Sequence, residues 1–206
     1  MDFSLMTSGI KEYMKAEERF IIERIAGSES VLDIGCGAGR YLQLLAPHVQ
    51  KIVGIDYAEQ MVAMAESVVA DLPNVSVINC SAEEITTHVN GTFEVALLAW
   101  NTIGNIQQKS HSLVFQNLAQ MVGKHIFISS YRLGKEVLEE RLKYYKNVGM
   151  KIEKIIGDHV IFEGDHIGAA YPRNYFRTLI SEAGFQPFIH EISSCGLIVE
   201  GRKLET

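Results

Sequence analysis

The amino-acid sequence predicts an α/β fold in which helices wind around both faces of a mostly parallel sheet. Two observations support this prediction. An apolar run at 31–34 leads into a loop with three alternating glycines and then into a helical pattern. Strand-like and helix-like segments then alternate through five strands with short links, an order typical of a doubly wound sheet with right-handed crossovers.

The first crossover is the segment most informative about a ligand. Residues 31–34 predict a buried strand, and residues 38–46 predict the helix that follows it. Between them, Gly35, Gly37 and Gly39 leave the turn without side chains, so a ligand can lie against main-chain N–H groups. Those N–H groups would sit at a helix N-terminus, where open α/β sheets receive nucleotide-like ligands.

The second strand, residues 51–56, is apolar and ends in Asp56. An acidic side chain about 20 residues after the first loop glycine can accept hydrogen bonds from a ribose diol. Both a nicotinamide dinucleotide and S-adenosylmethionine contain that ribose. A dinucleotide-binding loop needs Gly-x-Gly-x-x-Gly, and Arg40 stands where its last glycine would be. The sequence therefore favours S-adenosylmethionine, with a nicotinamide-dependent reductase as the alternative.

Apolar spacing assigns the remaining elements in chain order. Helical patterns lie at 11–26, 58–70, 82–87, 110–121 and 135–148, and strand-like runs lie at 75–79, 92–99 and 125–129. The last third of the chain departs from this alternation. It predicts a β-hairpin from 151–156 and 160–163, a helix at 174–183, and two last strands at 186–192 and 196–201.

The motif at the first crossover identifies a family. The order Asp33-x-Gly35-x-Gly37-x-Gly39, with Asp56 one strand later, resembles motif I and the ribose-binding acid of the class I S-adenosylmethionine-dependent methyltransferases. The resemblance implies a Rossmann-like methyltransferase fold, with a seven-stranded, mostly parallel sheet and a final antiparallel strand.

The resemblance covers residues 31–202, through motifs as far as Ala99 and through the order of elements beyond it. It implies that residues 1–206 form one methyltransferase domain. Residues 1–28 are then expected to be an N-terminal helical cap, and residues 151–164 a β-hairpin insertion on the substrate side.

The resemblance also implies a cofactor site at the carboxyl ends of the first strands. The glycine loop would pass beneath the methionine part of S-adenosylmethionine, Asp33 would hold that loop, and Asp56 would bind the ribose hydroxyls. Tyr57 and Met61 would lie beside the adenine, although Met61 can instead belong to the helix core. Ser81 replaces the Asp of the family's Asp-Ala pair, and its hydroxyl can still bond the adenine amino group. The expected set is Asp33, Gly35, Cys36, Gly37, Gly39, Asp56, Tyr57, Met61, Ser81, Ala82 and Asn101.

The acceptor is expected beyond the fourth and fifth strands, where Asn101 can place its carbonyl near the methyl donor. Candidates for catalysis are Asn101, Tyr131, His166 and Tyr171, with His111 and His159 as further possible bases. Candidates for substrate binding are Asn105, Arg132 and Arg173, because a guanidinium suits carboxylate or phosphate recognition. Metal-ligand residue types occur at Asp158, His159, Asp165 and His166, but we interpret this segment as an ordinary polar turn and predict no metal site.

Composition limits the class of protein. The chain of 206 residues is 47% hydrophobic and 21% charged, with a net charge of −6 and no basic stripe, which disfavours a nucleic-acid partner. Three widely spaced cysteines, no secretory signal and no membrane-length apolar run predict a cytoplasmic protein with reduced thiols. We therefore expect an enzyme that methylates an N or O atom of a small molecule and releases S-adenosylhomocysteine. Methylation of RNA or protein and a non-catalytic S-adenosylmethionine-binding regulator are the alternatives.

Overall fold

The computed structural model describes residues 3–164 and 166–204, and its main feature is a seven-stranded sheet of order β3-β2-β1-β4-β5-β10-β9. The strands are β1 (Ser30–Ile34), β2 (Lys51–Asp56), β3 (Val75–Asn79), β4 (Phe93–Leu98), β5 (Val122–Tyr131), β9 (Phe185–Glu191) and β10 (Gly196–Lys203). The neighbours among β1–β5 pair in parallel, while β10 is antiparallel to both β5 and β9. The predicted doubly wound, mostly parallel sheet with a final antiparallel strand is confirmed.

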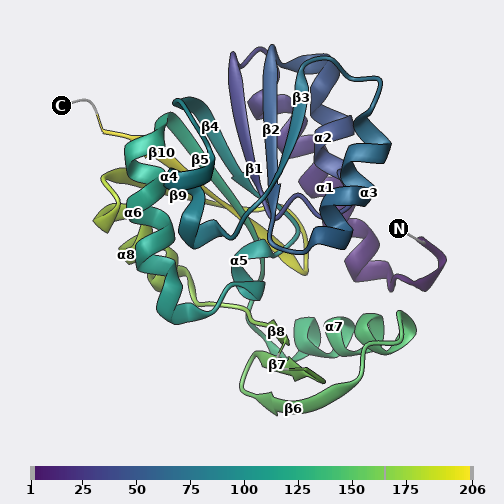
Figure 1. The fold of residues 1–206 in the computed structure, drawn as a ribbon. Coiled ribbons are helices and arrows are strands. Elements are labelled where there is room, and N and C mark those ends of the chain that lie inside the picture. Colours follow the sequence, from purple (N-terminus) through teal and green to yellow (C-terminus); the bar gives the residue numbers. More distant parts are fainter. Residues whose placement is uncertain (1–2, 165, 205–206) are drawn as a thin grey trace.

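Helices cover both faces of this sheet (Figure 1). On one face lie α1 (Ser8–Ile25), α2 (Arg40–Leu45) and α3 (Glu59–Val69), and on the other lie α4 (Ile85–His88), α6 (His111–Met121) and α8 (Arg173–Glu182). Each face has its own apolar core, and β1 contributes Leu32 and Ile34 to one and Val31 to the other. Burial on both faces explains why the parallel strands are near-continuous apolar runs in the sequence. No described helix combines the length and apolar character that a membrane crossing requires.

A second, smaller sheet lies beyond the carboxyl ends of the parallel strands, beside α7 (Lys135–Asn147) (Figure 1). It consists of β6 (Ile152–Ile156), β7 (His159–Phe162) and β8 (His166–Gly168), all antiparallel. The sequence pattern predicts the first two strands as a hairpin but not the third. A strand of three residues is too short to show an alternating pattern, so β8 has no sequence signal of its own.

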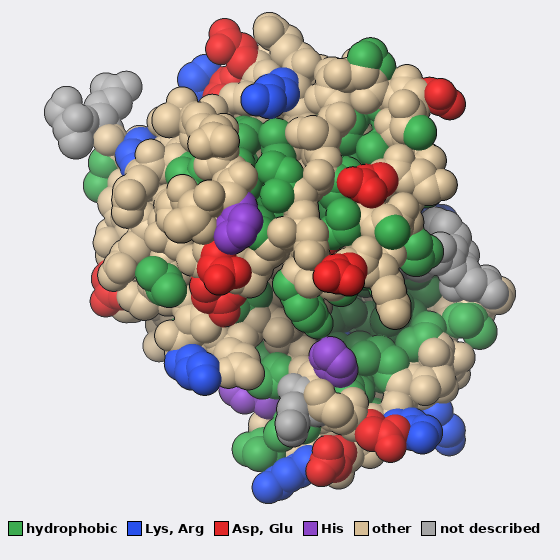
Figure 2. All heavy atoms as spheres, in the orientation of Figure 1, with side chains coloured by type: hydrophobic (Ala, Val, Ile, Leu, Met, Phe, Trp, Pro, Cys, Tyr) green, Lys and Arg blue, Asp and Glu red, His purple; other side chains and the backbone are tan. Residues whose placement is uncertain are grey.

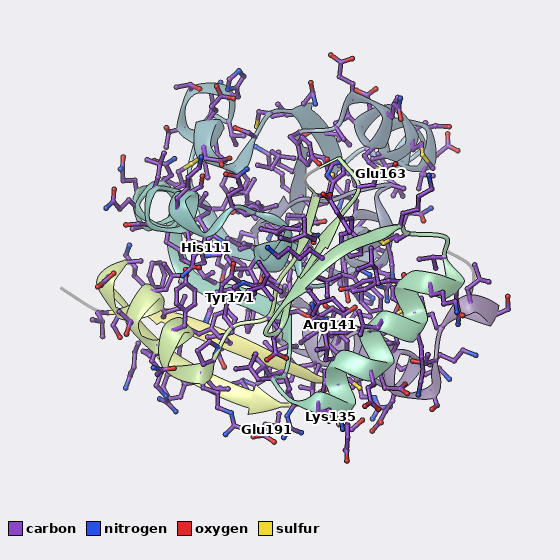
Figure 3. All side chains as sticks on the ribbon, turned by 90° about the horizontal axis from the view of Figure 1, so that it is seen from below. His111, Lys135, Arg141, Glu163, Tyr171 and Glu191 are labelled. Carbon is purple, nitrogen blue, oxygen red and sulfur yellow. The ribbon has the colours of Figure 1, made fainter. Side chains whose placement is uncertain are left out.

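Arg141 of α7 attaches this small sheet to the rest of the molecule. Its guanidinium is fully buried and donates hydrogen bonds to the carbonyls of Asp158 (3.0 Å) and Gly168 (2.5 Å). It also lies 4.8 Å from the centre of the Tyr131 ring, at the end of β5. Figure 3 shows Arg141 on the face of α7 that is turned toward the small sheet. One buried cation therefore joins the β6–β7 turn, the end of β8 and the main sheet.

Two element boundaries differ from the prediction for identifiable reasons. The helix expected from residue 38 begins at Arg40, because Gly39 adopts a left-handed conformation with φ of +84°. The fifth strand, expected at 125–129, runs from Val122 to Tyr131 because β10 pairs along most of its length. The four-residue helix α5 (Thr102–Asn105) after β4 was not predicted, and it lies at the edge where the site is expected. Short 3₁₀ turns lie at Phe3–Leu5, Ala46–His48, Ala82–Glu84 and Gln108–Ser110.

Candidate active site

The loop between β1 and α2 needs its glycines for conformational reasons. Gly35, Gly37 and Gly39 have φ of +68°, +54° and +84°, values that other residues rarely adopt. A Cβ on Gly35 would lie 2.6 Å from Thr102 Cγ2, and one on Gly39 would lie 3.3 Å from the Ala65 backbone. A Cβ on Gly37 would meet no atom of the described residues within 4 Å. The loop is therefore packed at both ends and open in the middle, where a ligand can approach the main chain.

Asp56, at the end of β2, organises this loop. Its Oδ2 accepts the Gly37 N–H and its Oδ1 accepts the Ala58 N–H, both at 2.9 Å. Asn79 at the end of β3 donates to the Asp56 carbonyl, also at 2.9 Å. The carboxylate that the sequence assigns to a ribose is thus already held in place by two backbone donors, directly beside the open part of the glycine loop.

Asp33 is the second carboxylate beneath the loop, and it is incompletely satisfied. Its side chain is 2% exposed, and its Oδ2 has no hydrogen-bond partner among the described residues. Burial raises the pKa of Asp33 to about 7, helped by the nearby negative charges of Asp56 and Glu17. A buried carboxylate oxygen without a partner is costly, so this position favours a ligand or water that donates to it.

A cavity of about 640 Å³ opens at the carboxyl edge of the sheet. Figure 2 shows the hollow between the main body and the small sheet, with hydrophobic side chains inside it. Seven of the predicted site residues line it: Gly35, Asp56, Tyr57, Ser81, Ala82, Asn105 and His166. The ends of β1, β2 and β3 form one half, and α5, the segment up to Ser110 and strand β8 form the other. This volume is that of a small-molecule site.

The turn after β4 brings α5 to this cavity. Trp100 and Asn101 have φ of +51° and +60°, a strained conformation for residues other than glycine. The Asn101 amide donates to the Ala169 carbonyl at 3.0 Å, and its Oδ1 accepts the Ser130 hydroxyl at 3.0 Å. The Asn101 side chain is therefore buried and used to hold the turn. This placement does not support the predicted role of Asn101 beside the methyl donor.

Comparison with known proteins agrees with this arrangement. Residues 31–125 match the family model of the methyltransferase domain, which includes the glycine loop and Asp56. This match agrees with the resemblance of the glycine loop and Asp56 to the class I methyltransferases. Enzymes of this family use S-adenosylmethionine as the methyl donor. A search of curated proteins by sequence finds no match.

Solved structures share the fold of this methyltransferase domain over almost the whole chain. Magnesium protoporphyrin IX methyltransferase from Synechocystis PCC 6803, with bound S-adenosylhomocysteine, has a TM-score of 0.66 and 16% identity, over 99% of this chain and 89% of that one. The 1,6-didemethyltoxoflavin-N1-methyltransferase of Burkholderia thailandensis has a TM-score of 0.68 and 13% identity, over 94% and 79%. N-methyltransferase NodS from Bradyrhizobium japonicum WM9 has a TM-score of 0.62 and 13% identity, over 95% and 96%. At these identities the likeness supports the fold.

The other expected cofactor residues of the methyltransferase domain are not part of the cavity lining. Cys36 is buried beneath the glycine loop, and burial raises the pKa of its thiol, which suits packing and not nucleophilic attack. Met61 is 39% exposed on α3, so it belongs neither to the lining nor to the buried core. Gly37 and Gly39 act through loop conformation, as described above.

Two tyrosine candidates for catalysis lie in aromatic clusters away from the cavity lining. Tyr131 is 3% exposed and packs against Tyr13 at 5.3 Å between ring centres. Tyr171 is also 3% exposed and stacks on Tyr175 at 4.6 Å, next to His111 (Figure 3). Burial raises the pKa of both phenols, that of Tyr171 to about 12, so neither is suited to accept a proton.

The three histidine candidates have different surroundings. His111 is buried: its Nε2 donates to the Ile106 carbonyl at 3.0 Å, which leaves Nδ1 to accept the Tyr175 hydroxyl at 2.7 Å. Burial lowers the pKa of His111 and keeps it neutral and structural. His159 packs 5.4 Å from the Tyr171 ring. Among these histidines only His166 lines the cavity.

Both arginines predicted to bind substrate are paired with Glu191 on β9. Arg132 lies 3.2 Å from the Glu191 carboxylate, and Arg173 contacts the other oxygen of the same group. Neither arginine belongs to the described cavity lining. Asp165, considered among the metal-ligand residue types, lies outside the described residues. Within the described residues, no three His, Cys, Asp or Glu side chains are grouped as a metal site.

Sequence reasoning missed Glu17, which supports the active-site turn from α1. Its side chain is fully buried, and Oε1 accepts the Trp100 N–H at 2.6 Å. Burial raises the pKa of Glu17. A signal was available, because Glu17 lies on the same helix face as the buried Ile10, Met14 and Ile21. An acid on an apolar face indicates a specific buried partner.

Proposed function

We propose that this protein is a cytoplasmic S-adenosylmethionine-dependent methyltransferase that methylates an N or O atom of a small molecule. The main support is one continuous cavity that extends from Gly35 of the glycine loop and Asp56 to His166 of the small sheet. Its size suits a cofactor together with a small acceptor. Three buried, unpaired cysteines agree with a reducing compartment.

The residues present fit an adenosyl cofactor. Asp56 would bind the ribose hydroxyls, Tyr57 would cover the adenine, and Ser81 with the Ala82 N–H would bond its edge. Tyr57 is 67% exposed at the cavity, so its ring has a free face to offer. The unpartnered Asp33 oxygen would face the ammonium group directly or through water. When bound, the cofactor supplies a methyl group already activated by its sulfonium.

The chain's own part in the reaction is alignment, exclusion of water and acceptance of a proton. We assign residues 151–164 as an insertion on the acceptor half. The predicted N-terminal cap, residues 1–28, contributes no described residue to the cavity lining, and its helix α1 packs on a face of the main sheet. Ile106 and Ile167 would exclude water around the reacting atoms, since both line the cavity. His166 would accept the proton that an alcohol or ammonium acceptor loses on methylation.

Calorimetric titration with S-adenosylhomocysteine tests the cofactor assignment without an acceptor. We expect binding in a one-to-one ratio, while NAD and NADP give no heat. Failure of correctly folded protein to bind S-adenosylhomocysteine would overturn the proposed function. Methyl transfer from labelled S-adenosylmethionine to a small-molecule panel, with RNA and protein extracts beside it, then tests the acceptor. Cofactor binding without transfer to any acceptor would indicate a regulatory binding protein.

A further inference from the structure

The acceptor half of the cavity has a distinct chemistry, and an inference from it rests on the proposed function. Besides Thr102, whose hydroxyl donates to the Ala99 carbonyl at 2.7 Å, five polar side chains line this half: Asn105, Gln107, Lys109, Ser110 and His166. We propose that the acceptor is a small molecule that bears an oxyanion, a carboxylate or a phosphate. Lys109 binds the oxyanion, and Asn105, Gln107 and His166 contribute further hydrogen bonds.

The first support is that these side chains have unused hydrogen-bonding capacity. None of the five makes a side-chain hydrogen bond or an ion pair with another described residue. Elsewhere in the molecule polar candidates are engaged: Arg132 and Arg173 with Glu191, and Asn101 with the Ala169 carbonyl. Because these side chains have no described protein partner, a ligand can bond to them without breaking an internal contact.

The second support is the balance of donors over acceptors. The two amides, the hydroxyl and the neutral imidazole each offer both donors and acceptors, whereas the Lys109 ammonium offers three donors and no acceptor, so the surplus of donors comes from Lys109. Such a set favours an acceptor molecule rich in oxygen lone pairs. Charge-assisted bonds from an ammonium to an oxyanion are the strongest of these contacts.

The third support is the separation of charge across the cavity. The acids of its lining are Asp56, at the end of β2, and Glu83, which follows Ala82 after β3. Asp56 belongs to the half assigned to the cofactor, whereas Glu83 also lies near His111, the residue after Ser110. Lys109 belongs to the other half and supplies the ammonium group of the lining there. Ile106 and Ile167 in the same half leave an apolar body of the acceptor a surface to pack on.

The experiment measures binding to protein saturated with S-adenosylhomocysteine, so no turnover is needed. Two pairs of probes are compared, in each of which one member bears an oxyanion and the other is neutral: 4-hydroxybenzoate against 4-hydroxybenzamide, and phenyl phosphate against phenol. We expect one anionic member to raise Tm and to bind at least about tenfold more tightly than its neutral partner, as one charge-assisted bond predicts. The carboxylate and phosphate arms distinguish the two kinds of oxyanion.

Variants identify the residue responsible. Lys109→Gln is expected to remove the anion preference, while Lys146→Gln, an exposed lysine on α7, leaves it intact. Lys109 is itself exposed, so its replacement preserves the fold, and circular dichroism checks this. Equal binding of charged and neutral probes, or an anion preference that persists in Lys109→Gln, would overturn the inference. Because S-adenosylhomocysteine binding is measured first, its loss would indicate failure of the proposed function instead.

Discussion

Replacing Gly104 by Ala tests whether α5 and the end of β8 form one packed unit. A Cβ on Gly104 would lie 2.2 Å from both the Ala169 carbonyl oxygen and the Asn101 Nδ2. Those atoms share a hydrogen bond of 3.0 Å, and the Ala169 N–H donates to the Gly104 carbonyl at 2.9 Å. Overpacking costs about 1–3 kcal/mol and each lost hydrogen bond about 1 kcal/mol. Alanine's better helix propensity returns about 1 kcal/mol.

The net expectation for Gly104→Ala is a destabilisation of about 2–4 kcal/mol, or roughly 5–15 °C in Tm for a chain of this length. Differential scanning calorimetry measures it. Gly123→Ala is the matched control, because its Cβ would lie 3.7 Å from the Phe93 carbonyl, an ordinary contact. We expect the control to stay within about 0.5 kcal/mol of the parent protein. If the Tm of Gly104→Ala equals that of the control Gly123→Ala, the packing argument is wrong.

Three further predictions concern buried carboxylates. The pKa of Asp33 is raised from 3.8 to about 7, so between these values the ligand-free folded protein keeps a proton that the unfolded chain releases. The free energy of unfolding should therefore fall by up to about 4 kcal/mol as pH rises through this window. Urea unfolding of Asp33→Asn between pH 5 and pH 8 should show that this pH dependence of the free energy of unfolding is lost. Asp56→Asn should weaken S-adenosylhomocysteine binding about 10–100-fold in calorimetry. The control variant Asp71→Asn, in an exposed loop, should bind like the parent protein. If Asp56→Asn and the parent protein bind with equal affinity, Asp56 is not part of the site. Glu17→Ala should cost about 2–4 kcal/mol in urea unfolding because the Trp100 N–H loses its acceptor, and Glu17→Gln, which keeps a carbonyl oxygen, should recover most of that loss.

The main sheet could be predicted because its strands are buried on both faces and its first turn uses glycine at positive φ. Residues such as Val31 and Leu32 contribute to opposite cores, which leaves a continuous apolar signal in the sequence. The elements that were missed, α5 and β8, have four and three residues. Such segments are stabilised by contacts made at a distance, including the bond from Asn101 to Ala169, and not by a local pattern.

The candidate site could be predicted more fully at the ends of β1, β2 and β3 than on the opposite side of the cavity, where only Asn105 and His166 were predicted. Strand order places Asp56 and Ser81 at one edge of the sheet, and both line the cavity. The same reasoning brings Tyr131 and Arg132 to that edge, but it cannot say which way a side chain points. The Tyr131 side chain packs in an aromatic core, and Arg132 forms an ion pair with Glu191, a residue distant in the sequence. Lys109 was not predicted, because nothing in the sequence distinguishes a lysine that lines a cavity from other exposed lysines.

The way in which Arg141 attaches the small sheet determines which of its residues are free to vary. The buried guanidinium donates hydrogen bonds to the main-chain carbonyls of Asp158 and Gly168, so these bonds do not depend on the side chains of the small sheet. Most of β6 is exposed to solvent, and its side chains can be exchanged without affecting the hydrogen bonds of Arg141. Side chains of the small sheet, including His166 and Ile167 that line the cavity, can therefore vary while the attachment to the main sheet stays the same.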